Sequence, residues 1–104
     1  MTDPETDREG FLTDLGSWSE QVAASIAGTE NLTLDAEHWQ IITLLRAFYA
    51  RTDVAPAMRA FVKLVREEFG DELGNSIRLM QLFGPSPAKT AAKIAGLPRP
   101  THCL

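Results

Sequence analysis

The chain has 104 residues, of which 44% are hydrophobic and 23% are charged. Because one domain takes roughly 100–200 residues, this length predicts a single domain over residues 1–104 and excludes a doubly wound nucleotide-binding domain or an α/β barrel. The formal net charge of −4 argues against a dedicated nucleic-acid coat protein. The segment 76–104 nevertheless carries four basic residues and no acidic ones, so it forms a basic end.

The N-terminal third predicts one helix after a polar segment. Residues 1–10 are mostly polar and acidic, and they predict a loose end or a short edge strand. The spacing Ser17-x-x-Glu20 is typical of a capping box, so a helix is expected to begin at Ser17 and to end at Gly28. Three apolar residues recur at intervals of four, as on the buried face of a helix: Trp18, Val22 and Ile26.

The middle of the chain predicts two longer helices. The first runs from Ala36 to about Arg51, after Asp35, which is well placed to cap it. Its wide apolar stripe predicts that this is the central helix of the fold. Pro56 favours the first position of a helix and Gly70 favours its end, so a third helix is expected between them.

Two shorter helices are predicted for the basic end. One begins after Asn75 and is expected to direct these apolar side chains inward: Ile77, Leu79, Met80, Leu82 and Phe83. The other runs from Pro87 to about Ala95 and ends at Gly96. The patterns together predict a mainly α fold, a small orthogonal bundle of about five helices. Two prolines prevent residues 97–104 from continuing the last helix, so these residues are expected to form an extended C-terminal arm.

Cys103 is the one cysteine of the chain, and it lies on this arm. A thiolate can attack the outer sulfur of a persulfide, hold it as Cys–S–SH and surrender it to another nucleophile, which requires access more than a pocket. An extended arm supplies that access. The candidate site therefore consists of Cys103 as the persulfide acceptor, with Arg99, Lys93 and His102 as docking or thiolate-favouring charges. An incidental surface thiol is the alternative interpretation.

Other conspicuous residues favour structural roles or different functions. His38 has no evident metal-binding or catalytic partners, so it is expected to be structural, and the two tryptophans are expected to anchor the core. The predicted helices 36–51 and 56–69 have the spacing of a helix-turn-helix. A DNA-binding regulator and a pure interaction protein therefore stay open as alternative functions.

The sequence carries no sign of a membrane, a disulfide or a metal. No apolar run reaches the roughly 18 residues of a membrane span, and no secretory signal is visible. We therefore expect a cytoplasmic protein with no membrane partner. One cysteine and two histidines at wide spacing provide neither an internal disulfide nor a zinc signature, so neither a metal nor an organic cofactor is expected.

Motifs distributed over nearly the whole chain resemble those of one known family. The most specific is Ile94-Ala95-Gly96-Leu97-Pro98-Arg99-Pro100-Thr101-His102-Cys103-Leu104, of the type I-A-G-L-P-[KR]-P-x-x-C-x. The shorter matches are Glu9-Gly10-Phe11-Leu12, Trp18-Ser19-Glu20, Glu37-His38-Trp39, Leu45-Arg46-Ala47-Phe48-Tyr49, Pro56-Ala57-Met58-Arg59, Leu82-Phe83 and Pro87-Ala88-Lys89. On these residues the chain resembles the DsrC/TusE family of sulfur-carrier proteins.

The resemblance implies a small helical domain with a short N-terminal β-hairpin and a mobile C-terminal arm, whose penultimate cysteine receives and passes on sulfane sulfur. In the DsrC branch, which works with dissimilatory sulfite reductase, a second cysteine lies eleven positions earlier. Ala92 occupies that position here. The one-cysteine, TusE-like branch is therefore the better match, and dissimilatory sulfite reductase is not expected as a partner.

For that branch, the resemblance implies a sulfurtransferase that acts by handover between proteins. It would take its persulfide from a TusBCD-like (DsrEFH-like) donor complex. The acceptor would be the tRNA thiouridylase that makes 2-thiouridine at the wobble position, so tRNA would be an indirect partner. A sulfur carrier in sulfur oxidation or dissimilatory sulfur metabolism is the alternative within the family.

Overall fold

The computed structural model describes residues 4–100, and five α-helices account for most of them. After a short 3₁₀ turn (Leu15–Ser17), the helices are α1 (Glu20–Thr29), α2 (Ala36–Thr52), α3 (Met58–Phe69), α4 (Ser76–Phe83) and α5 (Pro87–Ile94). The predicted mainly α fold class with about five helices is confirmed. No helix in this part of the chain is both long and apolar enough to span a bilayer.

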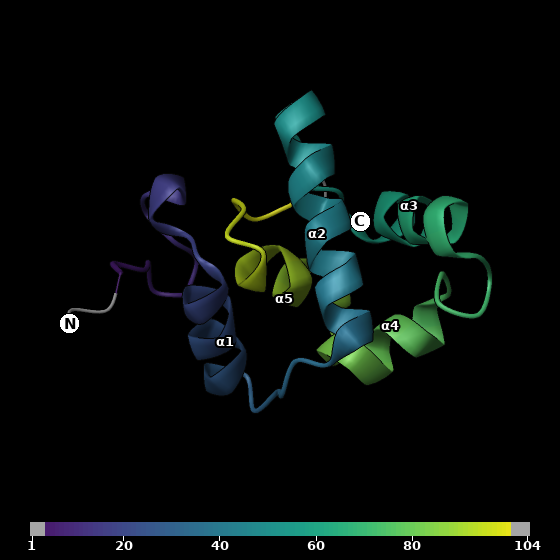
Figure 1. The fold of residues 1–104 in the computed structure, drawn as a ribbon, viewed down its shortest axis with the longest axis horizontal. Helices are drawn as coiled ribbons and strands as arrows, with labels where there is room; N and C mark the ends of the chain where they lie inside the picture. The colour runs from purple at the N-terminus through teal and green to yellow at the C-terminus, as the bar shows by residue number, and fades with distance from the viewer. Residues whose placement is uncertain (1–3, 101–104) are drawn as a thin grey trace.

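The centre of the fold is α5, which packs against each of the other four helices (Figure 1). The sequence instead predicted α2 as the central helix. Small residues explain why α5, and not α2, is central. Three alanines in and just after α5 are fully buried and let the neighbouring helices approach closely: Ala91, Ala92 and Ala95. The long helix α2 packs on α5 through its own buried face, which includes Ile41, Ile42 and Leu45.

Most helix boundaries follow the predicted signals. The Asp35 carboxylate accepts a hydrogen bond from the His38 amide at the start of α2, and Asn75 caps α4 in the same way. Gly70 ends α3 with a φ of 92°. These signals are local, because each cap acts on backbone groups within its own turn.

The boundaries of α1 and α3 differ from the predictions. Ser19, not Ser17, caps α1, because Ser17 belongs to the preceding 3₁₀ turn. Gly28 lies inside α1, and the chain turns away at Asn31, whose φ is 60°. Helix α3 begins at Met58, so Pro56 precedes the helix and does not open it.

Helix α4 buries only one side. Leu79, Leu82 and Phe83 are buried in the core, as predicted. Ile77 and Met80 were expected to point inward, but they are 68% and 42% exposed. These two residues are three positions apart and therefore share the outer face of a helix that packs with its opposite face.

His38 is a structural histidine, as the sequence predicted. Its ring is buried, its Nε2 lies 2.6 Å from the Leu82 carbonyl oxygen, and its Nδ1 lies 3.1 Å from the Asp35 amide nitrogen. The Phe83 ring meets it edge-on. These contacts tie the start of α2 to the end of α4. The hydrogen bond from the His38 amide lowers the pKa of Asp35.

The N-terminal hairpin is not confirmed. Between residues 4 and 100 the structure contains no strand, only one antiparallel bridge between Thr6 and Leu12. A tight turn joins the two halves of this bridge, because the Asp7 carboxylate accepts hydrogen bonds from the Glu9 and Phe11 amides. The first residues that the structure describes are thus folded onto the body, where a loose end was one expectation.

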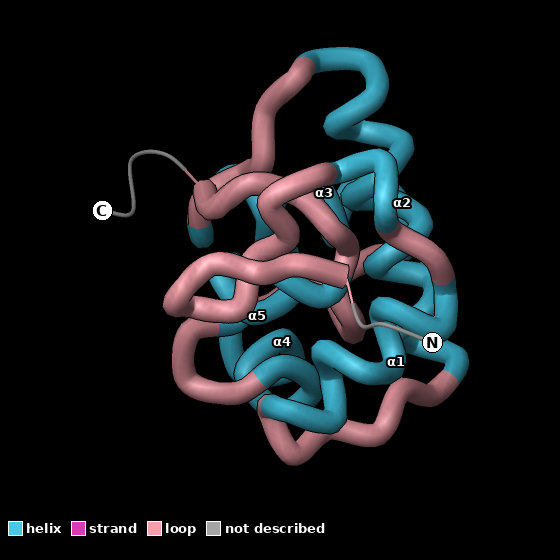
Figure 2. The backbone as a smooth tube through the Cα atoms, turned by 90° about the vertical axis from the view of Figure 1, so that its left-hand side faces the viewer, coloured by secondary structure: helices cyan, strands magenta, loops and turns pink. Residues whose placement is uncertain are grey.

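The arm is only partly described, and its mobility is not confirmed. Residues 97–100 lie against the body, with Leu97 and Pro100 buried, and they run beside the N-terminal turn (Figure 2). His102 and Cys103 lie outside the described residues.

Candidate functional site

The described part of the predicted site is the arm root, by which we mean the end of α5 and residues 95–100. Arg99 belongs to this root and Lys93 lies one turn before it, whereas Cys103 and His102 lie outside the described residues. The root fixes where the arm leaves the body. Among residues 4–100, no group of three or more histidine and acidic side chains is placed to hold a metal ion.

Trp18 and Arg46 brace the root from two other elements. The Trp18 indole Nε1 donates a hydrogen bond to the Ile94 carbonyl (2.9 Å), and the Arg46 guanidinium donates one to the Ala95 carbonyl (2.7 Å). The guanidinium also stacks on the Trp18 ring, 3.8 Å from its centre. The two side chains thus satisfy carbonyls that the end of a helix leaves without partners, and they place a positive charge at its negative end. Burial lowers the pKa of Arg46.

Gly96 turns the chain out of α5, as the sequence predicted. Its φ is 74°, its amide donates to the Lys93 carbonyl, and the Leu97 amide donates to the Ala92 carbonyl. This pair of hydrogen bonds is a Schellman motif. A side chain at Gly96 would also overlap Trp18, since a Cβ would lie 2.9 Å from the Trp18 Cβ and closer still to the ring.

Arg99 is held by the N-terminal turn, in a set of contacts that we call the clasp. Its guanidinium donates to Asp7 (2.9 Å), pairs with Glu9 and lies 5.3 Å from the centre of the Phe11 ring. Lys89 of α5 donates to Glu9 as well, at 2.5 Å. The clasp therefore joins the arm, the N-terminal turn and α5.

The two carboxyl groups of the clasp are easier to ionise than isolated ones. Desolvation raises the pKa of Asp7, but hydrogen bonds from the Phe11 and Glu9 amides and from Arg99 outweigh it, so the pKa of Asp7 is lowered overall. The hydrogen bond from Lys89, followed by the charge of Arg99, lowers the pKa of Glu9. Both side chains are thus held as carboxylates at neutral pH.

Lys93 and Arg99 both lie near Phe11, and both are paired with carboxylates. The Lys93 ammonium donates to Glu30 of α1 (2.7 Å) and lies 5.5 Å from the centre of the Phe11 ring. The two cations predicted to help docking or to favour a thiolate are therefore close together, with partners inside the molecule. Sequence reasoning missed these partners because they lie on segments far from the arm in the chain.

We expect the clasp to open on acidification. Because the folded pKa values of Asp7 and Glu9 lie below the reference values of 3.8 and 4.5, the stabilisation is fully present above those values and is lost as the pH falls through the lowered ones. In an NMR titration from pH 7 to about pH 2, which extends well below both reference values, the amide and side-chain Nε resonances of Arg99 should move toward those of an unpaired arginine.

The double variant Asp7→Asn, Glu9→Gln should show that acid-like Arg99 spectrum already at pH 7. Glu67→Gln is the matched control, because Glu67 is an exposed acid of α3 outside the clasp. Wild-type Arg99 resonances in the double variant at pH 7 would contradict the clasp.

Ala92, which takes the place of the second cysteine of the DsrC branch, lies in the core. Its side chain is 1% exposed, on the face of α5 that the other helices cover. A methyl group there offers the Cys103 thiol no covalent partner. Cys103 is the one cysteine of the sequence, so this chain contains no second thiol with which it could form an intramolecular disulfide.

Comparisons with known proteins agree with this geometry. The family model described as "DsrC like protein" matches residues 1–104. "Sulfurtransferase TusE" of Sodalis glossinidius is 48% identical over 103 residues, which is 99% of this chain and 95% of the relative. "Sulfurtransferase TusE" of Escherichia coli K12 is 46% identical over 100 residues, covering 96% of this chain and 92% of the relative.

Solved structures of DsrC proteins have the same fold as this chain. The NMR structure of Allochromatium vinosum DsrC matches with a TM-score of 0.85 and 46% identity, over 94% of this chain and 88% of that one. The oxidized γ-subunit of dissimilatory sulfite reductase (DsrC) from Archaeoglobus fulgidus matches with a TM-score of 0.83 and 38% identity, over 97% and 92%. The chain belongs to the DsrC-like family, as its motifs predict.

Proposed function

We propose that this chain is a sulfurtransferase of the TusE type, which carries sulfane sulfur as a persulfide on Cys103. The observation that carries the proposal is the match to relatives named sulfurtransferase TusE along nearly the whole chain, combined with a single cysteine to bear the sulfur. The braced root and the clasp support it, because they give residues 95–100, which lead toward Cys103, a defined path on the body.

The transfer is a pair of thiol exchanges. The Cys103 thiolate attacks the outer sulfur of a donor persulfide, the donor's S–S bond breaks, and the donor leaves as a thiolate with the electron pair. The outer sulfur and its proton are then part of Cys103–S–SH. A thiolate of the acceptor attacks that sulfur in turn and regenerates the Cys103 thiolate, so the cycle needs no oxidant, reductant or metal.

The charges near the arm receive supporting roles in this proposal. His102, when protonated, favours the thiolate of its neighbour, and Arg99 and Lys93 contribute positive charge once a partner displaces their carboxylates. A partner with acidic side chains would compete with Asp7 and Glu9 for Arg99. Docking would then release Arg99 from the clasp.

For partners, we propose a TusBCD-like donor complex and a tRNA thiouridylase as acceptor, in the cytoplasm, with tRNA as the final recipient. A role with dissimilatory sulfite reductase is the second candidate, because DsrC structures share the fold. Ala92 weighs against that second candidate, because it removes the thiol with which Cys103 would close an intramolecular bond.

The proposal is tested by loading and unloading the intact chain. The protein is incubated with a persulfide-loaded cysteine desulfurase, and intact-mass spectrometry is expected to show a gain of one sulfur atom that a reductant removes. Adding a thiouridylase with tRNA and ATP, which activates the uridine C2 oxygen as a leaving group, should discharge this species and yield 2-thiouridine. Failure to load from several competent donors would overturn the relay, and binding to duplex DNA that is independent of Cys103 would favour the helix-turn-helix alternative.

A further inference from the structure

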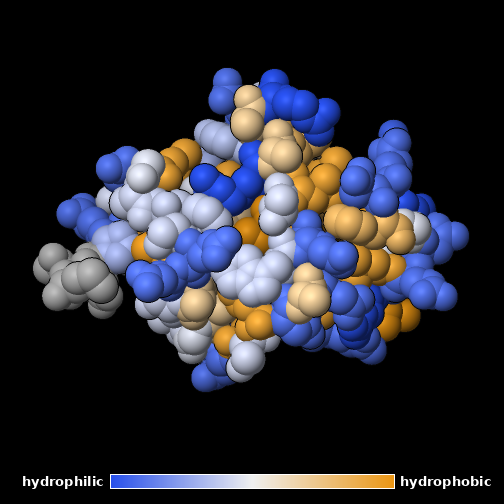
Figure 3. Space-filling model, viewed as in Figure 1, coloured by the Kyte–Doolittle hydropathy of each residue, from blue (hydrophilic) through white to orange (hydrophobic). Residues whose placement is uncertain are grey.

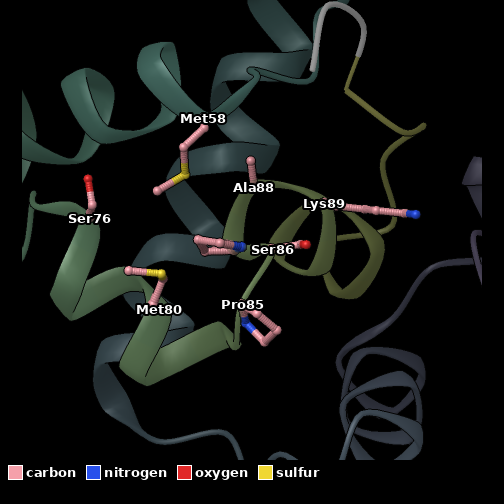
Figure 4. Close-up of a pocket in the computed structure, with 8 residues that line it drawn as sticks. Met58, Ser76, Met80, Pro85, Ser86, Ala88 and Lys89 are labelled. Atoms are coloured by element: carbon pink, nitrogen blue, oxygen red, sulfur yellow. The ribbon is translucent and has the colours of Figure 1, made fainter. Parts of the chain in front are cut away.

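A groove runs along α3 and α4, beside the start of α5. It consists of two adjoining hollows of about 450 and 580 Å³, which share Met58 and Ser76 as lining residues. Figure 4 shows the Met58 and Met80 side chains on two sides of the first hollow, with Ala88 and Pro85 from the start of α5 and the turn before it. We call this feature the α3–α4 groove.

The groove exposes apolar surface that the fold does not use. Met80 is 42% exposed, and Ile77, which lies one turn earlier on the same outer face of α4, is 68% exposed. Figure 3 shows apolar side chains at the molecular surface, between hydrophilic ones, on the side where α3 and α4 lie. A methionine side chain is flexible and can pack against apolar partners of different shapes, so Met58 and Met80 are suited to a surface that binds another protein.

The charge of the groove is opposite to that of the whole molecule. Arg59, Lys63 and Arg66 line the second hollow, and neither hollow has an acidic lining residue. Arg66 pairs with Asp71, whereas Arg59 and Lys63 form no ion pair within residues 4–100. Lys89 points away from the groove (Figure 4) because its ammonium binds Glu9. Two unpaired cations thus border an apolar floor in a chain of net charge −4.

The position of the groove suits a partner that also reaches Cys103. The groove borders the start of α5, where Lys89 lines it, and Arg99 of the arm root pairs with the same Glu9 that binds Lys89. Cys103 is three residues beyond Pro100 in the sequence, and three residues span at most about 11 Å, so a partner that reaches this thiol also comes near the body.

We propose that the α3–α4 groove docks an acidic amphipathic segment of a partner protein, with apolar side chains on Met58 and Met80 and carboxylates on Arg59 and Lys63. This inference rests on the proposed function, because that function implies that the partner is a protein that gives sulfur to Cys103 or takes it from Cys103. A nucleic acid fits less well, because a phosphate backbone gains nothing from the apolar floor.

The test is a fluorescence-anisotropy titration of the full chain with a labelled helical peptide that carries leucine along one face and glutamate along the other. Arg59→Glu with Lys63→Glu, and separately Met80→Ser, should each weaken binding, the double charge reversal by about tenfold or more. Arg8→Glu with Arg51→Glu is the matched control, because it makes the same charge change at exposed sites outside the groove, and it should bind like the wild type.

Two outcomes would overturn the inference. One is equal loss of binding in the control, which would mean that only net charge matters. The other is a single-stranded RNA that competes with the peptide and binds Met80→Ser as well as the wild type.

Loading of Cys103 from a small-molecule persulfide separates this inference from the proposed function. The groove variants should load normally from that donor, because it needs no docking site. If they load and still bind the peptide normally, the docking inference alone fails. If the wild type does not load but binds the peptide through the groove, the relay alone fails.

Discussion

Cys103→Ser is expected to abolish sulfur loading completely. A serine hydroxyl stays protonated at neutral pH, and it cannot form the S–S bond on which the carrier state depends. The chain has no second cysteine that could take over the reaction. After incubation with a persulfide donor, intact-mass spectrometry should show a reductant-sensitive gain of one sulfur in the wild type and none in the variant.

The variant should otherwise behave as the wild type does. None of the braces in the described fold depends on Cys103, so circular dichroism and urea unfolding should be unchanged. The variant should also still bind the acidic peptide in the α3–α4 groove. A gain of sulfur that persists in Cys103→Ser would refute the assignment of the persulfide to this residue.

The sequence predicted those parts of the fold that depend on neighbouring residues. The cap at Asp35, the start of a helix after Asn75 and the turn at Gly96 each depend on groups within one helical turn, and the structure confirms all three. The inward faces were predicted less well. An eight-residue helix such as α4 is too short for its periodicity to show which of two apolar faces is buried, so Ile77 and Met80 were assigned to the wrong side.

In the candidate site, too, local features could be predicted from the sequence and contacts between distant segments could not. Its family could be predicted because the C-terminal motif is local, and the family is confirmed by relatives that are themselves named sulfurtransferases. The role of Cys103 as the reacting residue stays a prediction. The supports of the arm could not be predicted. Trp18 and Ile94 are 76 positions apart, and Arg99 and Asp7 are 92 apart, so only the packed fold brings these groups together.

Gly96→Ala is expected to destabilise the protein by about 2–5 kcal/mol. A left-handed conformation costs a non-glycine residue roughly 1–2 kcal/mol, and overpacking a filled site costs typically about 1–3 kcal/mol more. Both costs apply, because φ is 74° and the new methyl group would overlap Trp18. Urea unfolding measures this decrease in the free energy of unfolding.

Gly28→Ala is the matched control. A Cβ at Gly28 meets no atom within 4 Å inside α1, so that change should be neutral or stabilising.

A double-mutant cycle with Trp18→Ala separates the two causes. Trp18→Ala alone should be costly, because it removes the hydrogen bond to the Ile94 carbonyl and the surface on which Arg46 stacks. Once the ring is gone, Gly96→Ala should lose much of its steric cost but keep its conformational cost, which gives a favourable coupling of about 1 kcal/mol or more. Strict additivity would mean that the Trp18 ring does not set the path of the arm. Coupling of the predicted sign would show that the contact between Trp18 and Gly96, on segments far apart in the chain, helps to fix the turn at the arm root.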